Sequence, residues 1–160
     1  MKKTKTLLLL LGLVAPVLFF GQGETSNWYS GNRAGIQFNN DSSVETLTDG
    51  RTNTVEGCAT ISDTFGDSLF YTDGIFVYDR NHNTIQNGTG LYSYPSSTQS
   101  ANIVPKPDDP NIYYIFTMDT TTWDTDANRG LNYSIVDLTL SNGNGVVVEK
   151  NIKKINGSAR

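Results

Sequence analysis

The sequence has almost no cysteine or histidine, the residues that most often bind metals or serve as nucleophile and base. Its only cysteine is Cys58 and its only histidine is His82. A single cysteine excludes an intrachain disulfide and a thiolate metal cluster, so we expect Cys58 to be a small buried hydrophobic residue in a strand. Ser62, Ser68 and Ser96 lack a Gly-x-Ser-x-Gly setting. We therefore expect His82 to be an exposed turn residue, and the protein to be a non-enzyme that needs no cofactor.

Positive charge is also scarce, and it is unevenly placed. The chain carries 12 Lys and Arg against 16 Asp and Glu, a net charge of -4. Three of the lysines, Lys2, Lys3 and Lys5, lie in the first five residues, and without them the remainder is more acidic still. An acidic surface repels nucleic acid and anionic membranes. We expect no nucleic-acid partner, and no membrane insertion once the amino-terminal segment is removed.

Long hydrophobic runs are missing except for one near the amino terminus. Residues 7–20 are apolar apart from Gly12 and Pro16, and Gly21-Gln22-Gly23 follows. A lysine-rich start, an apolar run and small residues after it are typical of a secretory signal peptide. A retained membrane anchor is disfavoured because a spanning helix needs about 20 residues and Pro16 interrupts the run. We expect residues 1–23 to be a signal peptide, and residues 24–160 to be secreted or held at the cell surface.

Helical periodicity is absent from residues 24–160, which are rich in Thr, Tyr, Asn, Gly, Ser and Asp. Runs of β-branched and aromatic residues alternate with turn residues instead, a pattern typical of short antiparallel strands. Residues 86–100 look like a polar connection, and residues 105–111 like a proline-rich turn that cannot be a central strand. The expected strands are residues 34–38, 58–62, 68–72, 75–78, 101–104, 112–117, 133–140 and 146–152.

Two parts of the chain look like copies of one unit. Each has a strand, a turn and then an aromatic strand, Leu69-Phe70-Tyr71 in the first and Ile112-Tyr113-Tyr114 in the second. A period of roughly 40–50 residues with four strands per unit is typical of a β-propeller. We therefore expect an all-β fold of propeller-like repeat blades in residues 24–160, with a β-sandwich as the alternative.

A blade cannot cover both of its faces alone, and roughly three stacked units are needed for stability. We count two units, at about residues 58–83 and 101–154, after a leading strand. We therefore expect residues 24–160 to be an incomplete fragment, the amino-terminal part of a larger domain. Ile36 and Phe38 of the leading strand would then lack neighbours.

One acidic segment resembles the start of a calcium-binding loop. Asp124, Asp126 and Asn128 offer oxygen ligands at alternate positions. The match to that loop fails in detail, because Gly130 comes one place late for the sharp turn and Ile135 stands where the closing Glu belongs. A polar surface loop explains the segment better. Asp124, Asp126 and Asn128 are thus weak metal candidates, and we expect no metal to be bound.

The remaining candidates are aspartates at strand ends and aromatic side chains. We expect the aspartates to cap backbone amides of turns and not to form a glycosidase pair. Exposed aromatics on a β-scaffold can stack on sugar rings, whereas buried ones pack between sheets. We expect packing for Tyr71 and Tyr114, and we expect Trp123, which lies in a polar segment, to be the surface-contact residue. The aspartates are Asp63, Asp67, Asp73 and Asp79.

A series of short motifs occurs in order from Asn27 to about Lys154. They are Asn27-Trp28-Tyr29, Gly31-Asn32-Arg33-Ala34-Gly35-Ile36-Gln37-Phe38, Glu56-Gly57-Cys58-Ala59-Thr60-Ile61-Ser62-Asp63, Leu69-Phe70-Tyr71-Thr72-Asp73-Gly74, Asn87-Gly88-Thr89-Gly90-Leu91, Pro95-Ser96-Ser97-Thr98-Gln99-Ser100, Ile103-Val104-Pro105-Lys106-Pro107 and Ile112-Tyr113-Tyr114-Ile115-Phe116-Thr117. This series resembles the amino-terminal region of large secreted Bacteroidetes proteins that end in a gliding motility-associated domain, the type B sorting domain of the type IX secretion system. The resemblance implies a propeller-type repeat domain and export to the cell surface. The sequence departs from it because no sorting domain is present.

Export, acidity, all-β repeats and this resemblance point to a non-catalytic interaction module of an adhesin-like protein, associated with gliding motility or type IX secretion. Its expected partner is an unidentified surface protein or glycan. Two alternatives stay open: a secreted carbohydrate-binding protein or glycan-active enzyme, and a structural spacer in a multimodular surface protein. Fold alone does not decide among them.

Overall fold

The computed structural model describes residues 23–119 and 129–155, and across these residues the chain is all-β, with no α-helix. Two short 3-10 turns, η1 (Gly23–Thr25) and η2 (Ser141–Gly143), accompany the strands. The strands are β1 (Asn27–Ser30), β2 (Ala34–Phe38), β3 (Val44–Leu47), β4 (Ala59–Ser62), β5 (Ser68–Thr72), β6 (Phe76–Asp79), β7 (Thr84–Thr89), β8 (Ala101–Lys106), β9 (Asp109–Met118), β10 (Leu131–Asp137) and β11 (Val146–Ile155).

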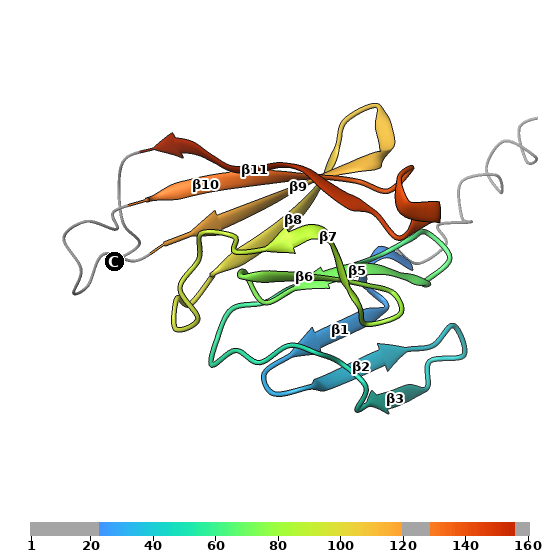
Figure 1. Ribbon diagram of the computed structural model, residues 1–160. Helices are drawn as coiled ribbons and strands as arrows, with labels where there is room; N and C mark the ends of the chain where they lie inside the picture. The colour runs from blue at the N-terminus through green and yellow to red at the C-terminus, as the bar shows by residue number, and fades with distance from the viewer. Residues whose placement is uncertain (1–22, 120–128, 156–160) are drawn as a thin grey trace, which may run out of the picture.

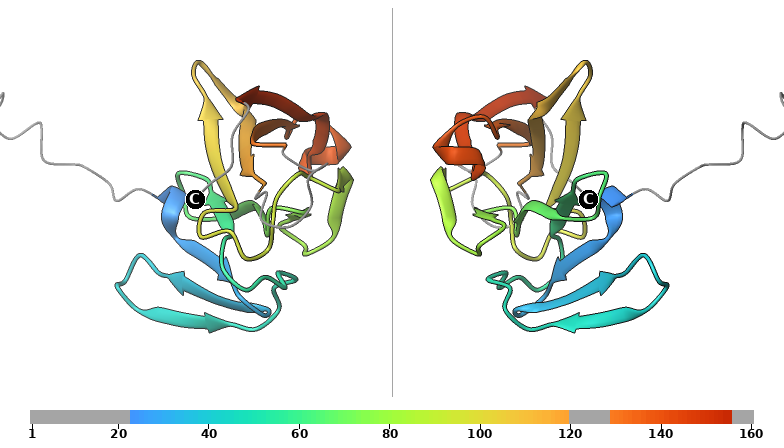
Figure 2. Two further views of the ribbon diagram at one scale, coloured as in Figure 1. Left: turned by 90° about the vertical axis from the view of Figure 1, so that its left-hand side faces the viewer. Right: turned by 90° about the vertical axis from the view of Figure 1, so that its right-hand side faces the viewer.

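The strands form three antiparallel units, each made of strands consecutive in sequence. β1–β3 is a three-stranded sheet, whereas β4–β7 and β8–β11 are four-stranded meanders joined by a single parallel bridge between Gln86 and Val146. The first strands of the units are neighbours, since β1 contacts β4 and β4 contacts β8. Figure 1 shows β8–β11 at the top, β4–β7 in the middle and β1–β3 at the bottom, and Figure 2 shows the β1–β3 sheet set apart at one side. The expected all-β fold is confirmed, and the pairing is compatible with both propeller-like blades and a sandwich.

Two hairpins are closed by the same aspartate turn. The Asp63 carboxylate accepts the backbone N–H of Phe65 at 2.9 Å and of Asp67 at 3.0 Å. In the β6–β7 hairpin, the Asp79 carboxylate likewise accepts the N–H of Asn81 and Asn83, at 2.8 and 2.9 Å. These bonds satisfy amides that the tight turn leaves without a strand partner. The expected capping role of the strand-end aspartates is therefore confirmed at both positions.

The main hydrophobic core lies between the two four-stranded meanders. Phe70, Val77, Ile115 and Val136 are fully buried there. Strand alternation sends the neighbours of Phe70 and Val77, Tyr71 and Tyr78, to the opposite face, where they join a second buried cluster with Tyr29. The middle unit is therefore covered on both faces. The rest of the main cluster is Ile85, Leu91, Ile103, Tyr113, Leu138 and Val147.

Some strands differ from those expected. β1, β3 and β7 are additional, and most of β7 falls in the segment 86–100, which was expected to be a polar connection. Only Ile85 of β7 is a buried apolar residue, so the sequence carries little strand signal and the pairing with β6 decides its conformation. The proline-rich turn is shorter than expected, because β8 continues through Lys106 and β9 begins at Asp109. Pro105 is tolerated because β8 is an edge strand.

Candidate functional site

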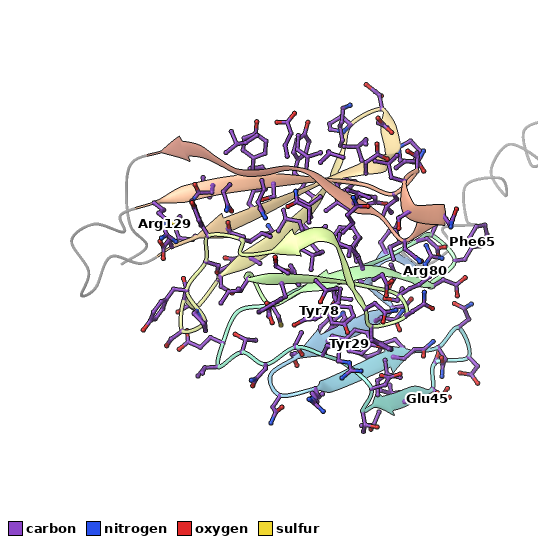
Figure 3. All side chains as sticks on the ribbon, viewed as in Figure 1. Tyr29, Glu45, Phe65, Tyr78, Arg80 and Arg129 are labelled. Atoms are coloured by element: carbon purple, nitrogen blue, oxygen red, sulfur yellow. The ribbon has the colours of Figure 1, made fainter. Side chains whose placement is uncertain are left out.

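Three tyrosines stack between the β1–β3 sheet and the middle unit. The Tyr71 ring of β5 lies 4.5 Å from the Tyr29 ring of β1 and 5.2 Å from the Tyr78 ring of β6, measured between centroids. Figure 3 shows Tyr29 and Tyr78 close together where these two units meet. All three side chains are buried, so the packing role expected for Tyr71 is confirmed. Tyr114, expected to pack in the same way, is half-buried against Phe116 and Tyr133.

The stack is tied to the loop after β3 by a chain of polar contacts. Nε2 of His82 lies 3.2 Å from Oδ2 of Asp49, and Nδ1 of His82 lies 2.9 Å from the hydroxyl of Tyr71. That hydroxyl accepts the backbone N–H of Arg51 at 3.1 Å, and the Tyr29 hydroxyl donates to Asp49 at 3.4 Å. We call Tyr29, Asp49, Tyr71, Tyr78 and His82 the tyrosine clamp.

The expectation that His82 is an exposed turn residue is wrong. Its side chain is only 19 % exposed, because the loop carrying Asp49 and Arg51 folds over it. Its backbone has φ of 64°, in the left-handed region, at the position that Gly66 occupies with φ of 95° in the other aspartate turn. A non-glycine residue in this region is strained. The contacts with Tyr71 and Asp49 offset that strain.

The tyrosine clamp contains a phenol, an imidazole and a carboxylate in series, as a proton relay would. The Tyr71 hydroxyl, however, is buried, and its partners are Arg51 and His82. Tyr78 is likewise bonded within the cluster, to Asp73 at 3.3 Å. Because these hydroxyls are engaged inside the protein, they are in no position to meet a substrate. The clamp joins the β1–β3 sheet to the middle unit.

The tyrosine clamp should weaken at alkaline pH. Burial raises the pKa of Tyr29, Tyr71 and Tyr78 from 10.0 to about 12, with the nearby Asp49 and Asp73 adding to the effect. The folded protein then keeps protons that the unfolded chain releases between pH 10 and about 12, so the free energy of unfolding falls as pH rises through this window. Urea denaturation below this pH window and within it measures the loss of unfolding free energy. The Tyr71→Phe variant should lose less free energy over the same window. Ionisation of all eight tyrosines together near pH 10, followed by ultraviolet absorbance, would contradict this.

A second feature is the face of the β1–β3 sheet opposite the tyrosine clamp. Trp28, Ile36, Phe38 and Val44 project from it and are 55 %, 41 %, 41 % and 60 % exposed. Trp28 pairs across strands with Ile36, and Phe38 pairs with Val44. The Trp28 and Phe38 rings meet edge to face at 5.4 Å. We call these four residues the outer face.

The outer face arises because both sides of this small sheet are apolar. Tyr29 and Leu47 point inward to the clamp, and Gly35 lies between them. A Cβ on Gly35 would lie 2.9 Å from the Tyr29 ring and 3.0 Å from Leu47, so glycine permits this close packing. Alternation then leaves Trp28 and Ile36 on the other side. The sequence indicated that Ile36 and Phe38 share a face, but it did not single out Trp28.

Trp123, Asp124, Asp126 and Asn128, the surface and metal candidates from the sequence, lie outside the described residues. Within the described residues, no three His, Cys, Asp or Glu side chains are grouped to hold a metal ion, and no helix is long and apolar enough to cross a membrane. Cys58 differs from expectation, because it precedes β4 and is half-buried on the wall of a hollow of about 420 Å³. Burial raises the pKa of its thiol, which disfavours the reactive thiolate.

The candidate functional site is therefore the outer face, with the tyrosine clamp holding its sheet in place. Exposed apolar groups that are contiguous on one sheet are typical of surfaces that bind partners. In comparisons with known proteins, the chain matches no family model, no curated protein and no solved structure.

Proposed function

We propose that this protein is a non-catalytic interaction module of an adhesin-like protein, exported by residues 1–23 and acting at the cell surface or outside the cell. The observation that carries the proposal is the outer face, where Trp28 and Phe38 stay in contact with water side by side on one sheet. The acidic net charge of -4 supports a partner other than nucleic acid. In keeping with the resemblance, we propose an association with gliding motility or type IX secretion, and residues 24–160 as part of a larger propeller-like domain.

The outer face suits weak, repeated contacts. Each of its side chains has roughly half its surface left to bury, which contributes on the order of 1 kcal/mol per side chain. Association costs about 4 kcal/mol or more in lost translation and rotation, so one such face binds weakly alone. Several copies on one surface raise the overall affinity by about 10²–10⁴ through effective concentration. Such multivalent binding is what an adhesin requires.

A second candidate function is carbohydrate binding. It is favoured by Trp28, whose indole is 55 % exposed while its Nε1 donates to the carbonyl of Thr25 at 2.9 Å. That bond fixes the ring, and a fixed, exposed ring can stack on the apolar face of a sugar. In this case the partner is a glycan and not a surface protein.

Replacing two residues of the outer face should weaken adhesion strongly. We expect the Trp28→Ser, Phe38→Ser double variant to bind intact Bacteroidetes cells at least about tenfold more weakly than the parent protein, since each substitution removes apolar contact area. Binding of the fluorescently labelled protein without residues 1–23 to these cells measures the difference in affinity. The matched control is Phe65→Ser, an 83 % exposed phenylalanine at the tip of the β4–β5 hairpin (Figure 3).

The same assay separates the candidate functions. Loss of binding after protease treatment of the cells supports a protein partner, and loss after periodate oxidation supports a glycan. Equal binding by the double variant and the parent would contradict the role of the outer face. Release of reducing sugar from cell-surface glycans by the purified protein would contradict the non-catalytic proposal and favour a glycan-active enzyme.

A further inference from the structure

The strand β3 leaves one edge of the small sheet open. Strand order places β1 and β3 at the two ends of the three-stranded sheet, and β4 and β8 at the two ends of the larger one. β1 is covered by β4, since the Tyr29 N–H donates to Thr60 Oγ1 at 3.0 Å. β3 pairs only with β2 and lies at the outer edge of the molecule in Figure 1.

Proteins protect open edges with proline, lysine or bulges, because an open edge can pair with another chain. β8 has such protection, with Pro105 and Lys106 at its end and a register shift between them. β3 has none of these three devices, and its protection is limited to its length of four residues and one charged side chain, Glu45. Its sequence, Val-Glu-Thr-Leu, contains neither proline nor lysine, and its pairing with β2 runs from Val44 to Leu47 without a shift.

The hydrogen-bond pattern identifies which backbone groups of β3 are open. The N–H of Asn39 donates to the carbonyl of Ser43 at 2.9 Å, which makes this pair a hydrogen-bonded one. Antiparallel ladders alternate between bonded and non-bonded pairs, so Glu45 and Leu47 also bond to β2. Val44 and Thr46 then direct their N–H and C=O groups away from β2. Each of these two residues offers one donor and one acceptor to an added strand.

The charge on β3 and in the turn before it has one sign. Residues 34–48 contain Asp41 and Glu45 and no lysine or arginine, and the nearest arginines in the sequence, Arg33 and Arg51, lie outside this hairpin. Glu45 lies on β3 itself, on the face opposite Val44, and its side chain is exposed (Figure 3). An added strand would therefore neighbour Val44 and Thr46 on one face, with Phe38 one strand further in, and the Glu45 carboxylate on the other.

We propose that β3 accepts an extended segment of a partner protein as a fourth strand, and that this segment alternates apolar residues with Lys or Arg. Its apolar side chains would pack beside Val44 and the methyl group of Thr46, and its cationic ones would face Glu45. The small sheet would then have four strands, as β4–β7 and β8–β11 have. The inference rests on the proposed function and specifies the chemistry of its protein partner.

The test uses a synthetic nine-residue peptide of alternating valine and lysine, with both ends blocked, added to the isotopically labelled protein. We expect the amide signals of Val44 and Thr46 to shift and their hydrogen exchange to slow, because these amides gain partners. A peptide of alternating valine and glutamate is the matched probe and should bind about tenfold more weakly or worse, because it faces Glu45 with like charge.

Two variants test the edge. Thr46→Pro removes an outward N–H without breaking a bond to β2, and it should abolish binding, whereas Thr46→Val should keep it. Glu45→Lys leaves the backbone unchanged and should weaken binding of the lysine peptide about tenfold, so it decides the matter if the proline variant fails to fold.

The proposal is overturned if Val44 and Thr46 do not respond to the lysine peptide, if both peptides bind alike, or if Glu45→Lys binds as the parent does. Such a result leaves the proposed function standing when the Trp28→Ser, Phe38→Ser variant still loses adhesion. Adhesion that survives in that variant contradicts the proposed function instead, whatever the peptide does.

Discussion

Replacing Phe70 by alanine is expected to lower the free energy of unfolding by about 3–5 kcal/mol. Phe70 is fully buried between the two four-stranded meanders, and its ring meets that of Tyr113 edge to face at 5.4 Å. Truncation removes its transfer free energy and leaves a cavity that the surrounding strands cannot fill, because β4 and β6 hold β5 in register from both sides. Urea denaturation followed by circular dichroism measures the change.

The same hairpin supplies the control. Phe65 lies five residues earlier in the turn and is 83 % exposed, so Phe65→Ala should change the free energy of unfolding by no more than about 0.5 kcal/mol. A comparable loss of unfolding free energy in Phe70→Ala and Phe65→Ala would contradict a specific role of Phe70 in packing the meanders together. A loss in neither would exclude a shared core between β4–β7 and β8–β11.

Replacing Tyr71 by alanine is expected to lower the free energy of unfolding by a similar amount, about 3–5 kcal/mol. Tyr71 lies on the face of β5 opposite Phe70. The change removes the middle ring of the tyrosine clamp and the acceptor for the Arg51 N–H. We therefore expect the amides of β1–β3 to exchange with solvent faster than those of β9 and β10, since the clamp is what holds the small sheet.

Two comparisons make this result specific. Tyr71→Phe keeps the ring and loses only the hydroxyl, so it should cost about 1–3 kcal/mol from the buried groups left unsatisfied. Tyr114→Ala, at a half-buried tyrosine on β9, should cost about 1–2 kcal/mol and leave exchange in β1–β3 unchanged. Faster exchange in β9 and β10 than in β1–β3 for Tyr71→Ala would contradict the role of the clamp.

The candidate site was only partly predictable. That Ile36 and Phe38 share a face follows from the period of two along a strand, which needs no tertiary information. Their exposure was expected only on the interpretation of an incomplete fragment, in which they lack neighbours; alternation alone does not give it, because it makes Tyr29 and Leu47 equally good candidates for the water side. In the structure, Tyr29 and Leu47 are on the inner face of the small sheet, because they pack against Tyr71 and Tyr78.

The environment of His82 could not be predicted from the sequence. A lone histidine in a polar turn has no local partner, and its exposure was the natural expectation. Its partners are Tyr71, 11 positions earlier, and Asp49, in the loop after β3. A contact between residues so far apart in sequence depends on how the sheets meet, and spacing along the chain carries no information about that.

The sequence by itself determined the strand class and the local turns. Alternating apolar residues and the absence of helical periodicity require β-structure, and aspartates such as Asp63 and Asp79 close their hairpins through bonds to amides two and four residues away. Only the tertiary structure decided that β7, with its single buried apolar residue Ile85, is a strand, and that β5 is buried on both faces. The physical reason is the distance along the sequence between interacting residues. Turns and periodicity depend on neighbours in sequence. Burial depends on which sheet covers which, and the packing of all units together sets that.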